Sequence, residues 1–223
     1  MVITGAFGAL GRVVAAAAAE AGWRVVAIDR ADRPPEGYPA DAETLGGVDL
    51  TDAEAARLAM AEARRRTGRL DALVSLAGGF VYETLEEGGS ETWTRYFTLN
   101  LATAVNAAKA ALPYLIEGGA GRIVNVGAAS ALHASAGMGP YAASKSAVHR
   151  FTESLAAEVK LKHVTVNAVL PSIIDTPANR ASMPKADPSR WVSPRELAAV
   201  ILFLASPEAS AVTGALLPVA GRV

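Results

Sequence analysis

The sequence contains no cysteine, which excludes disulfide bonds, thiolate metal ligands and a thiol nucleophile. An excess of one charge is also missing, because 21 lysines and arginines stand against 22 aspartates and glutamates, for a formal net charge of -1. Nucleic acid is therefore not an expected partner. No apolar run approaches the roughly 18 residues that a membrane helix needs, and the start "MVITGAFGAL" lacks the features of a leader. We expect a soluble, cytoplasmic protein that acts on a small molecule.

The three histidines, His133, His149 and His163, are scattered and lack the spacing of metal ligands. We therefore expect no metal site and interpret all three as surface or loop residues.

Short β-branched runs alternate with longer helical patterns along all 223 residues, as in parallel strands joined by crossover helices. Strands such as "ALVSLAG" and "RIVNVGA" are apolar on both faces, which places them in a sheet covered on both sides. The pattern predicts an α/β protein with a doubly wound parallel sheet (Rossmann fold) in three α/β/α layers. No repeat or linker divides the chain, so we expect one domain over 1–223. Strands are predicted at 1–4, 23–28, 44–48, 70–76, 122–126, 164–169 and 216–219, and helices at 9–21, 52–67, 91–115, 141–160 and 194–205.

One stretch interrupts the alternation, the proline-rich and charged "IIDTPANRASMPKADPSRWVSP" at 173–194. Loops of about 20 residues inside compact domains are usually functional or disordered. A disordered loop would leave Met183 and Trp191 in solvent, so we favour a substrate lid.

Three glycines, Gly5, Gly8 and Gly11, stand between the first predicted strand and the first predicted helix. The first permits the turn, the second lets a diphosphate approach the backbone, and the third allows the helix to pack closely. Backbone N–H groups and the helix dipole favour a pyrophosphate at this point. The turn residues that we expect at a dinucleotide cofactor are Gly5, Phe7, Gly8, Ala9 and Leu10.

Asp29 closes the second predicted strand, "WRVVAIDR", where a carboxylate can accept both hydroxyls of an adenosine ribose. This favours NAD(H), because the phosphate of NADP(H) would meet a negative charge. Arg30 could hold that phosphate, so NADP(H) stays possible.

Two further positions follow from the same geometry, since the carboxyl ends of parallel strands form the ligand crevice. Asp49 could take an adenine amino group, and Ala77–Gly79 could form a floor without side chains. Either could equally be ordinary turn chemistry. Phe80 and Tyr82, which follow Gly79, could stack on a flat ring or pack in the core.

Tyr141 and Lys145 are separated by one helical turn and share a helix face. A nearby ammonium stabilises a phenolate, so Lys145 is expected to lower the pKa of the tyrosine from about 10 toward the working range. The pair, on a helix that follows the strand "GRIVNVGA", predicts proton transfer at Tyr141. Lys145 can also reach the nicotinamide ribose.

Together with "LAGG", "TLNLATAVNAAKAALP", "YAASK", "PSIIDT" and "VTGALLPVAG", these motifs resemble the short-chain dehydrogenase/reductase family over the whole chain. The resemblance implies that Tyr141 is the proton donor or acceptor, that Lys145 binds the ribose, and that Asn100 holds a water in the proton relay. It adds three residues to the expected cofactor site and implies a homo-oligomer, a dimer or a tetramer. The added residues are Pro171, Ile173 and Thr176, with Thr176 near the nicotinamide carboxamide.

The chain also departs from the family pattern. Ala128 replaces the family's serine, the glycine turn reads GxxGxxG instead of the commoner GxxxGxG, and Ser172 replaces a usual glycine. Ser130 could supply the missing hydroxyl if the preceding strand ended one bulge later.

These departures, and above all "IDTPANRASMPKADPSRW", resemble the dihydropteridine reductases within the family, which implies NADH-dependent reduction of a quinonoid dihydropterin. Such a substrate accepts hydride on a conjugated imine and needs one proton at nitrogen, so Tyr141 alone could suffice. An ordinary ketone reductase would miss the serine, whose hydroxyl polarises a developing oxyanion. Two alternatives stay open: a general carbonyl or quinone reductase of the same family, and a catalytically silent NADH-binding sensor or scaffold.

Overall fold

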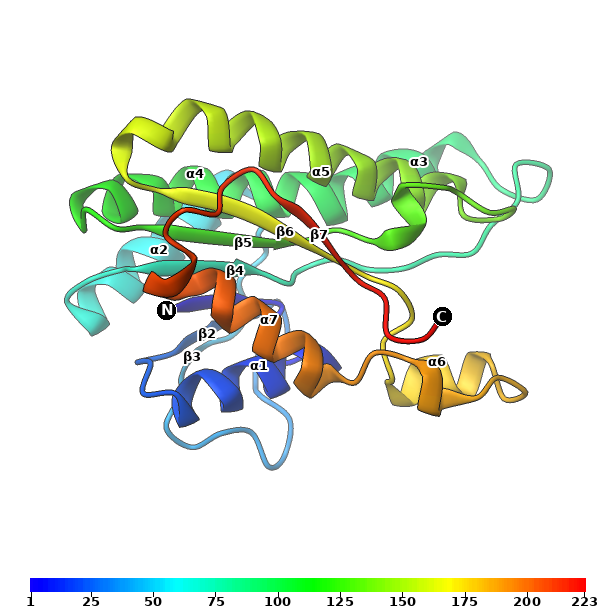
Figure 1. Cartoon of the computed structure of the whole chain (residues 1–223), viewed down its shortest axis with the longest axis horizontal. Coiled ribbons are helices and arrows are strands. Elements are labelled where there is room, and N and C mark those ends of the chain that lie inside the picture. The colour runs from blue at the N-terminus through cyan, green and yellow to red at the C-terminus, as the bar shows by residue number, and fades with distance from the viewer.

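A parallel sheet of seven strands, in the order β3-β2-β1-β4-β5-β6-β7, organises the chain (Figure 1). The computed structural model describes residues 1–223. The strands are β1 (Val2–Thr4), β2 (Val26–Ile28), β3 (Glu43–Leu45), β4 (Ala72–Ser75), β5 (Arg122–Val126), β6 (Thr165–Pro171) and β7 (Leu216–Val219). The helices are α1 (Ala9–Glu20), α2 (Ala53–Thr67), α3 (Ser90–Tyr96), α4 (Thr103–Glu117), α5 (Gly139–Val159), α6 (Pro177–Ser182) and α7 (Pro194–Ala205).

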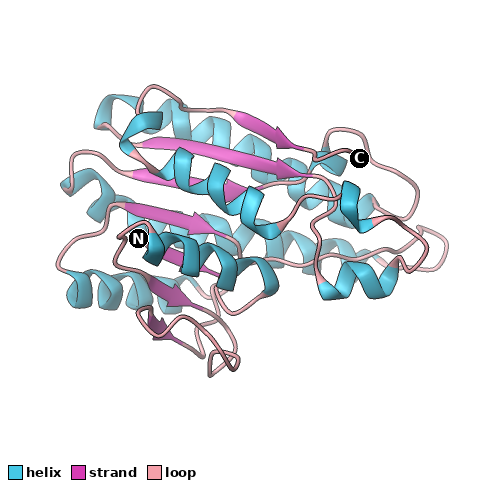
Figure 2. Cartoon of the chain, turned by 60° about the horizontal axis from the view of Figure 1, so that its bottom comes forward, coloured by secondary structure: helices cyan, strands magenta, loops and turns pink.

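Helices cover both faces of the sheet, as Figures 1 and 2 show. One apolar core lies between the sheet and α2, α4 and α5, and a second lies between the sheet and α1 and α7. The central strands β1, β2, β4, β5 and β6 are buried along almost their whole length. The predicted doubly wound, three-layer α/β fold is confirmed. No helix combines the length and the apolar character that crossing a membrane requires.

Local chemistry sets several helix ends where the sequence predicts them. Asp52 caps α2 by accepting the N–H groups of two residues in its first turn, and Gly68 ends that helix in the left-handed conformation. Ser193 and Glu196 form a capping box at the start of α7, next to Pro194 at the first helical position. The helix predicted at 194–205 is observed with the predicted bounds, and so is the strand predicted at 122–126.

The helix predicted at 91–115 is interrupted. Between α3 and α4 lies the π-helical segment Phe97–Ala102, in which hydrogen bonds skip one more residue than in an α-helix. The side chain of Asn100 on this segment is hydrogen-bonded to Gly79, in the loop after β4, and to Ser144 of α5. Such π-bulges occur frequently at functional sites.

The segment 173–194 is folded, with α6 and a 3₁₀ turn at Pro188–Arg190. Ile174 and Val192 form a parallel bridge, and Arg180 makes two hydrogen bonds to the carboxylate of Asp175, at 2.6 and 2.7 Å. Trp191 is buried. The expectation that this segment is not a disordered loop is therefore met.

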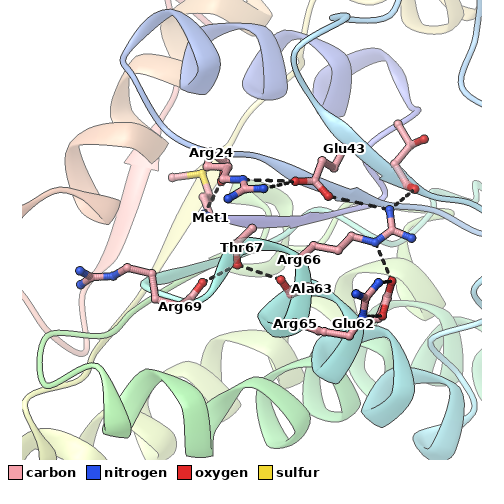
Figure 3. A network of polar contacts seen from close by, with 10 residues as sticks. Met1, Arg24, Glu43, Glu62, Ala63, Arg65, Arg66, Thr67 and Arg69 are labelled. Carbon is pink, nitrogen blue, oxygen red and sulfur yellow. Dashed lines mark hydrogen bonds and ion pairs between the residues drawn. The ribbon is translucent and has the colours of Figure 1, made fainter.

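At the amino-terminal ends of β1 to β3, a network of polar contacts joins the sheet edge to the end of α2 (Figure 3). Glu43 pairs with Arg24 at 3.0 Å and with Arg66 at 3.9 Å, and Arg66 also pairs with Glu62 at 2.7 Å. The Arg24 side chain is 62% exposed, and those of Glu43, Glu62 and Arg66 keep 29 to 32% of their surface in solvent. Solvent therefore screens these pairs, and their contribution to stability is small. The network lies at the strand ends opposite to the carboxyl ends, which form the ligand crevice in folds of this type.

Candidate active site

A cavity of about 490 Å³ opens at the carboxyl ends of β1, β2 and β4. It lies where parallel α/β sheets bind their ligands. The structure thus brings most of the predicted cofactor residues to one site. The predicted residues that line it are Gly5, Phe7, Gly8, Ala9, Leu10, Asp29, Arg30, Asp49, Ala77 and Gly78. The remaining members of the predicted set do not line this cavity: Gly79, Tyr141, Lys145, Pro171, Ile173 and Thr176.

The glycine turn fits a phosphate cradle. Gly5 has φ +61°, and a side chain on it would approach the backbone of Ala77 to 2.8 Å. A side chain on Gly11 would overlap the carbonyl of Gly5, so only glycine lets α1 pack this closely. Gly8 precedes α1 without a side-chain cap, and the first turn contains no acidic residue. Free N–H groups at this helix start suit an anion.

The carboxylate of Asp29 is oriented by two backbone donors: the N–H of Phe7 lies 2.9 Å from Oδ2, and the N–H of Ala31 lies 3.0 Å from Oδ1. Each oxygen keeps a lone pair for a further hydrogen bond, as an adenosine ribose requires. Arg30 lines the same cavity and makes no ion pair within the chain. Both residues that bear on the choice between NAD(H) and NADP(H) therefore face one site.

Tyr38 is a residue of this region that sequence reasoning missed. Its ring packs edge-on against Phe7, with 5.3 Å between the ring centroids. Burial, and then the charge of Asp29, raise the pKa of Tyr38 to about 12. It stands in a proline-rich loop without a motif, so no signal in the sequence could have found it.

Asp49 stabilises the turn in which it lies, which partly explains why an aspartate stands at this position. Its Oδ1 accepts the backbone N–H of Thr51 at 2.9 Å and the hydroxyl of Thr51 at 2.8 Å. These hydrogen bonds, led by the backbone one, lower the pKa of Asp49. The turn chemistry considered as an alternative is therefore present, and the same side chain lines the cavity.

Lys145 is buried on α5, with 7% of its surface exposed, and its Nζ donates a hydrogen bond to the carbonyl of Val126 at 2.8 Å. Burial lowers the pKa of Lys145 from 10.5 to about 8. The ammonium thus joins α5 to the last residue of β5.

Tyr141 lies one turn before Lys145, and its hydroxyl makes no hydrogen bond within the chain. Burial raises the pKa of Tyr141 to about 12. The expected lowering of this pKa by Lys145 is not found, because burial is the only resolved cause and it disfavours the phenolate. At neutral pH the hydroxyl keeps its proton and is available as a donor. The ring of Phe80 packs edge-on against it, with 4.9 Å between centroids.

Asn100 is buried and clamps the loop after β4. Its Nδ2 donates to the carbonyl of Gly79 at 3.2 Å and to Oγ of Ser144 at 2.9 Å, while its Oδ1 accepts the N–H of Gly79 at 2.8 Å. Both amide N–H donors are thereby occupied. The water of a proton relay stays a prediction. With both donors occupied, such a water must bind an acceptor of Asn100, either the second lone pair of Oδ1 or the backbone carbonyl.

Gly78 explains how the two ends of the site meet. A Cβ at this position would lie 2.5 Å from Oδ1 of Asn100 and 3.5 Å from Nζ of Lys145. A side chain would therefore fill the space between the amide and the ammonium. Gly78 also lines the dinucleotide cavity, so this bare backbone connects the predicted cofactor site to the predicted catalytic residues.

The position of the absent serine contains no hydroxyl. Ala128 is buried, and its backbone is extended. β5 pairs with β6 in unbroken register through Val126, and Gly127 continues the ladder by donating to Val169 at 2.9 Å. The bulge that would bring Ser130 into this position is thus not formed, and Ser130 lies on the 3₁₀ turn Ala129–Ala131.

The end of β6 presents the remaining predicted residues. Pro171 is buried as the last residue of the strand, and Ile173 accepts the N–H of Val192 at 2.9 Å. Thr176 caps α6 by accepting the N–H of Asn179 at 3.2 Å. These residues share the carboxyl edge of the sheet with the cavity, and their contact with a nicotinamide stays a prediction.

A glycine turn beneath a helix start, a carboxylate after β2 and a tyrosine–lysine pair on α5 define the class: a dinucleotide-dependent oxidoreductase. The model of the short chain dehydrogenase family matches residues 1–187. The chain therefore belongs to the short-chain dehydrogenase/reductase family and is an NAD(P)-dependent enzyme of it.

Relatives cover nearly the whole chain. The 3-oxoacyl-[acyl-carrier-protein] reductase FabG of Vibrio harveyi is 33% identical over 233 residues, which span 98% of this chain and 94% of that protein. The inactive 2-(S)-hydroxypropyl-CoM dehydrogenase 2 of Xanthobacter autotrophicus is 34% identical, over 93% of this chain and 98% of that protein. Among solved structures, the 3-ketoacyl-(acyl-carrier-protein) reductase from Brucella melitensis complexed with NADH has a TM-score of 0.87 at 28% identity, over 99% and 96% of the two chains.

The geometry of Asp29 leads to a prediction about the nucleotide. In Asp29→Ala, the dissociation constant for NADH should rise roughly ten- to hundredfold, since a charge-assisted hydrogen bond contributes about 1.5–3 kcal/mol. NADPH should change much less, because its ribose phosphate never benefits from the carboxylate. Titration calorimetry with both nucleotides gives the ratio of the dissociation constants for NADH and NADPH. A general loosening of the turn changes both constants and cancels in this ratio. Asp49→Ala is the matched control, and an unchanged ratio in Asp29→Ala would contradict the ribose contact.

The buried ammonium leads to a second prediction. Because the pKa of Lys145 is lowered from 10.5 to about 8, the unfolded chain binds more protons between these pH values, and stability rises with pH there. Below pH 8 the burial of the charge costs about 3 kcal/mol. Relative to Lys145→Met, the wild type should therefore gain about 3 kcal/mol of unfolding free energy between pH 7.5 and 10.5.

Urea unfolding of both proteins at several pH values tests this. The difference between their free energies of unfolding cancels the contribution of groups that titrate alike in the two. If the free energies of unfolding of the two proteins changed with pH in parallel, folding would not lower the pKa of Lys145.

Proposed function

We propose that the chain reduces a flat, conjugated acceptor with NAD(P)H, that quinonoid dihydropterin is the first candidate, and that Tyr141 is the only protein group that donates a proton. The observation that carries the proposal is the surroundings of the Tyr141 hydroxyl. It has no partner in the chain, the serine position beside the catalytic helix is Ala128, and no bulge brings Ser130 there.

The residues at the cavity fit a dinucleotide. The uncapped start of α1 and the glycine turn suit the diphosphate, Asp29 has free lone pairs for the ribose, and the backbone of Gly78 leaves the floor open. When bound, the reduced nicotinamide supplies a hydride. Lys145, which stands one helical turn after Tyr141 on α5, would hold the neighbouring ribose.

Proton transfer then follows from the state of Tyr141. With a pKa of about 12, its hydroxyl is protonated throughout the neutral range, which suits the reductive direction. The substrate gains two electrons with the hydride and one proton from the hydroxyl, and solvent returns a proton to the phenolate through the relay near Lys145 and Asn100. A conjugated imine nitrogen takes this proton directly, without a second donor on an oxyanion.

Phe80 supports a flat substrate. Its side chain is 57% exposed and lies against the ring that carries the donor. Tyr96 fixes the backbone here, because its hydroxyl donates to the carbonyl of Phe80 at 2.8 Å. The exposed ring on a fixed backbone offers a wall for stacking, which typically contributes about 0.5–1.5 kcal/mol.

Three further parts belong to the same proposal. NADH is the preferred nucleotide, the segment 173–194 acts as a lid over the substrate, and the protein works in the cytoplasm as a homo-oligomer. The fixed base of that segment, from the Ile174–Val192 bridge to buried Trp191, gives the lid a rigid attachment.

A second candidate is a general carbonyl or quinone reductase of the same family, and the carbonyl case is favoured by the similarity to proteins named 3-oxoacyl-[acyl-carrier-protein] reductase and acetoacetyl-CoA reductase. The same roles would apply to Tyr141, Lys145 and Asn100. A catalytically silent NADH-binding protein is the third, and one relative is named as inactive.

One comparison of substrates separates the three candidates. Oxidation of NADH and of NADPH is measured with freshly generated quinonoid dihydropterin, a quinone, a 3-oxoacyl thioester and simple ketones, for the wild type and for Phe80→Ala. We expect rapid turnover of the pterin and little of the ketones. Phe80→Ala should raise the KM for the pterin about tenfold, which corresponds to 1.4 kcal/mol, and Leu85→Ala, an exposed residue of the same loop, should not.

Turnover of the thioester in preference to the pterin would replace the first candidate by the second. No turnover at all, with NADH still bound, would favour the silent protein. Equal effects of Phe80→Ala and Leu85→Ala would remove Phe80 from the substrate wall.

A further inference from the structure

His149 is buried beneath the position of the absent serine, although the sequence pattern places it on the surface. Only 2% of its surface is exposed, and its Nε2 accepts the backbone N–H of Ala128 at 3.3 Å. Because Nε2 is the acceptor, a neutral imidazole carries its proton on Nδ1. Burial, then the charges of Arg150 and Lys145, lower the pKa of His149 to about 4, which keeps it neutral.

The backbone after β5 is held to α5 by three side chains of that helix. Lys145 donates to the carbonyl of Val126 at 2.8 Å, and Ser146 donates to the carbonyl of Ala131 at 2.9 Å. His149 is the third, and it accepts from Ala128, which lies between the other two contacts. The segment 126–131 is thereby fixed along the first turns of the helix that carries Tyr141.

Gly127 is matched to the imidazole. A Cβ at this position would overlap Nε2 of His149 and lie 3.3 Å from the side chain of Leu170. The space that another residue would use for its side chain is therefore occupied by the histidine. Gly127 and His149 are complementary, and together they shape the serine-less segment.

We propose that His149 is a positioning residue for proton transfer: by binding Ala128 it fixes the segment whose Val126 carbonyl anchors the Lys145 ammonium. The carbonyl of Val126 belongs to the peptide unit whose N–H, on Gly127, donates to Val169 at 2.9 Å, and the next peptide unit is held by His149 through the N–H of Ala128. Losing the contact with His149 therefore leaves the Val126 carbonyl anchored from one side only and free to shift away from Lys145. Lys145 then loses its only hydrogen-bond partner within the chain. This inference rests on the proposed roles of Lys145 and Tyr141.

The test compares His149→Gln with His149→Met. The amide oxygen of glutamine can accept from Ala128 at a reach similar to that of Nε2, whereas methionine fills the space without an acceptor. Amide hydrogen exchange of the 123–133 region, read by mass spectrometry, should be at least tenfold faster in His149→Met and close to wild type in His149→Gln. With the best substrate of the panel, kcat should fall about tenfold in His149→Met and stay within threefold in His149→Gln.

A histidine with only a packing role gives a different result. Both variants would then lose melting temperature, while the exchange of 123–133 and the kcat of the folded protein stay those of the wild type, and this outcome would overturn the inference. The exchange measurement needs no substrate. If the panel shows no turnover by the wild type, the proposed function fails, and the exchange data alone decide whether His149 holds the segment.

Gly127→Ala provides a test that leaves the histidine in place. The new methyl group should displace the imidazole from Ala128, with the same faster exchange and lower kcat as His149→Met. Adding His149→Ala should relieve the overlap, so the double variant should regain melting temperature over Gly127→Ala without regaining kcat. Recovery of both together would mean that the contact with Ala128 has no part in positioning Lys145.

Discussion

The hydrogen bond from the buried Lys145 ammonium to the carbonyl of Val126 is the contact on which the arrangement of the catalytic end depends. It joins α5 to the carboxyl edge of the sheet, and Tyr141, one turn earlier, is carried to the same edge. An ammonium in a dry site is costly, and its pKa is accordingly lowered to about 8. The buried ammonium therefore lowers the stability of the fold, and it also fixes a positive charge at the point where proton transfer is proposed.

The two ends of the site are connected by bare backbone. Gly78 lines the cavity of the predicted cofactor residues and also lies where a side chain would separate Asn100 from Lys145. The side-chain amide of Asn100 accepts the N–H of Gly79 and donates to the carbonyl of Gly79 and to Ser144 on α5. The loop after β4 and α5 are therefore held in one hydrogen-bonded unit, and the π-helical segment places Asn100 at its centre.

Motifs with local chemistry could be predicted from the sequence. The glycine turn, Asp29 and the Tyr141–Lys145 pair act through turn geometry, strand ends and helical spacing, which are visible in a few consecutive residues. The structure confirms the fold and gathers the residues predicted to bind the adenosine at one cavity.

Features set by packing could not be predicted in the same way. The π-helical segment has the apolar pattern of an ordinary helix, so its extra residue per turn leaves no trace in the spacing. His149 stands next to Arg150 in a helix with a polar face, and only the missing side chain of Gly127 makes room for its burial. The pKa of Tyr141 was expected to fall because the charge of Lys145 was considered without the burial of the tyrosine itself.

The central claim is that Tyr141 donates the proton and has no substitute. It is tested most directly by turnover of Tyr141→Phe with saturating NADH and the best acceptor, alongside the dissociation constant for NADH. General acid catalysis typically contributes about 10²–10⁴-fold, so kcat should fall at least about a hundredfold while NADH binding stays within about twofold of the wild type. A variant that retains a third or more of the wild-type turnover would contradict the account, because another group would then be supplying the proton.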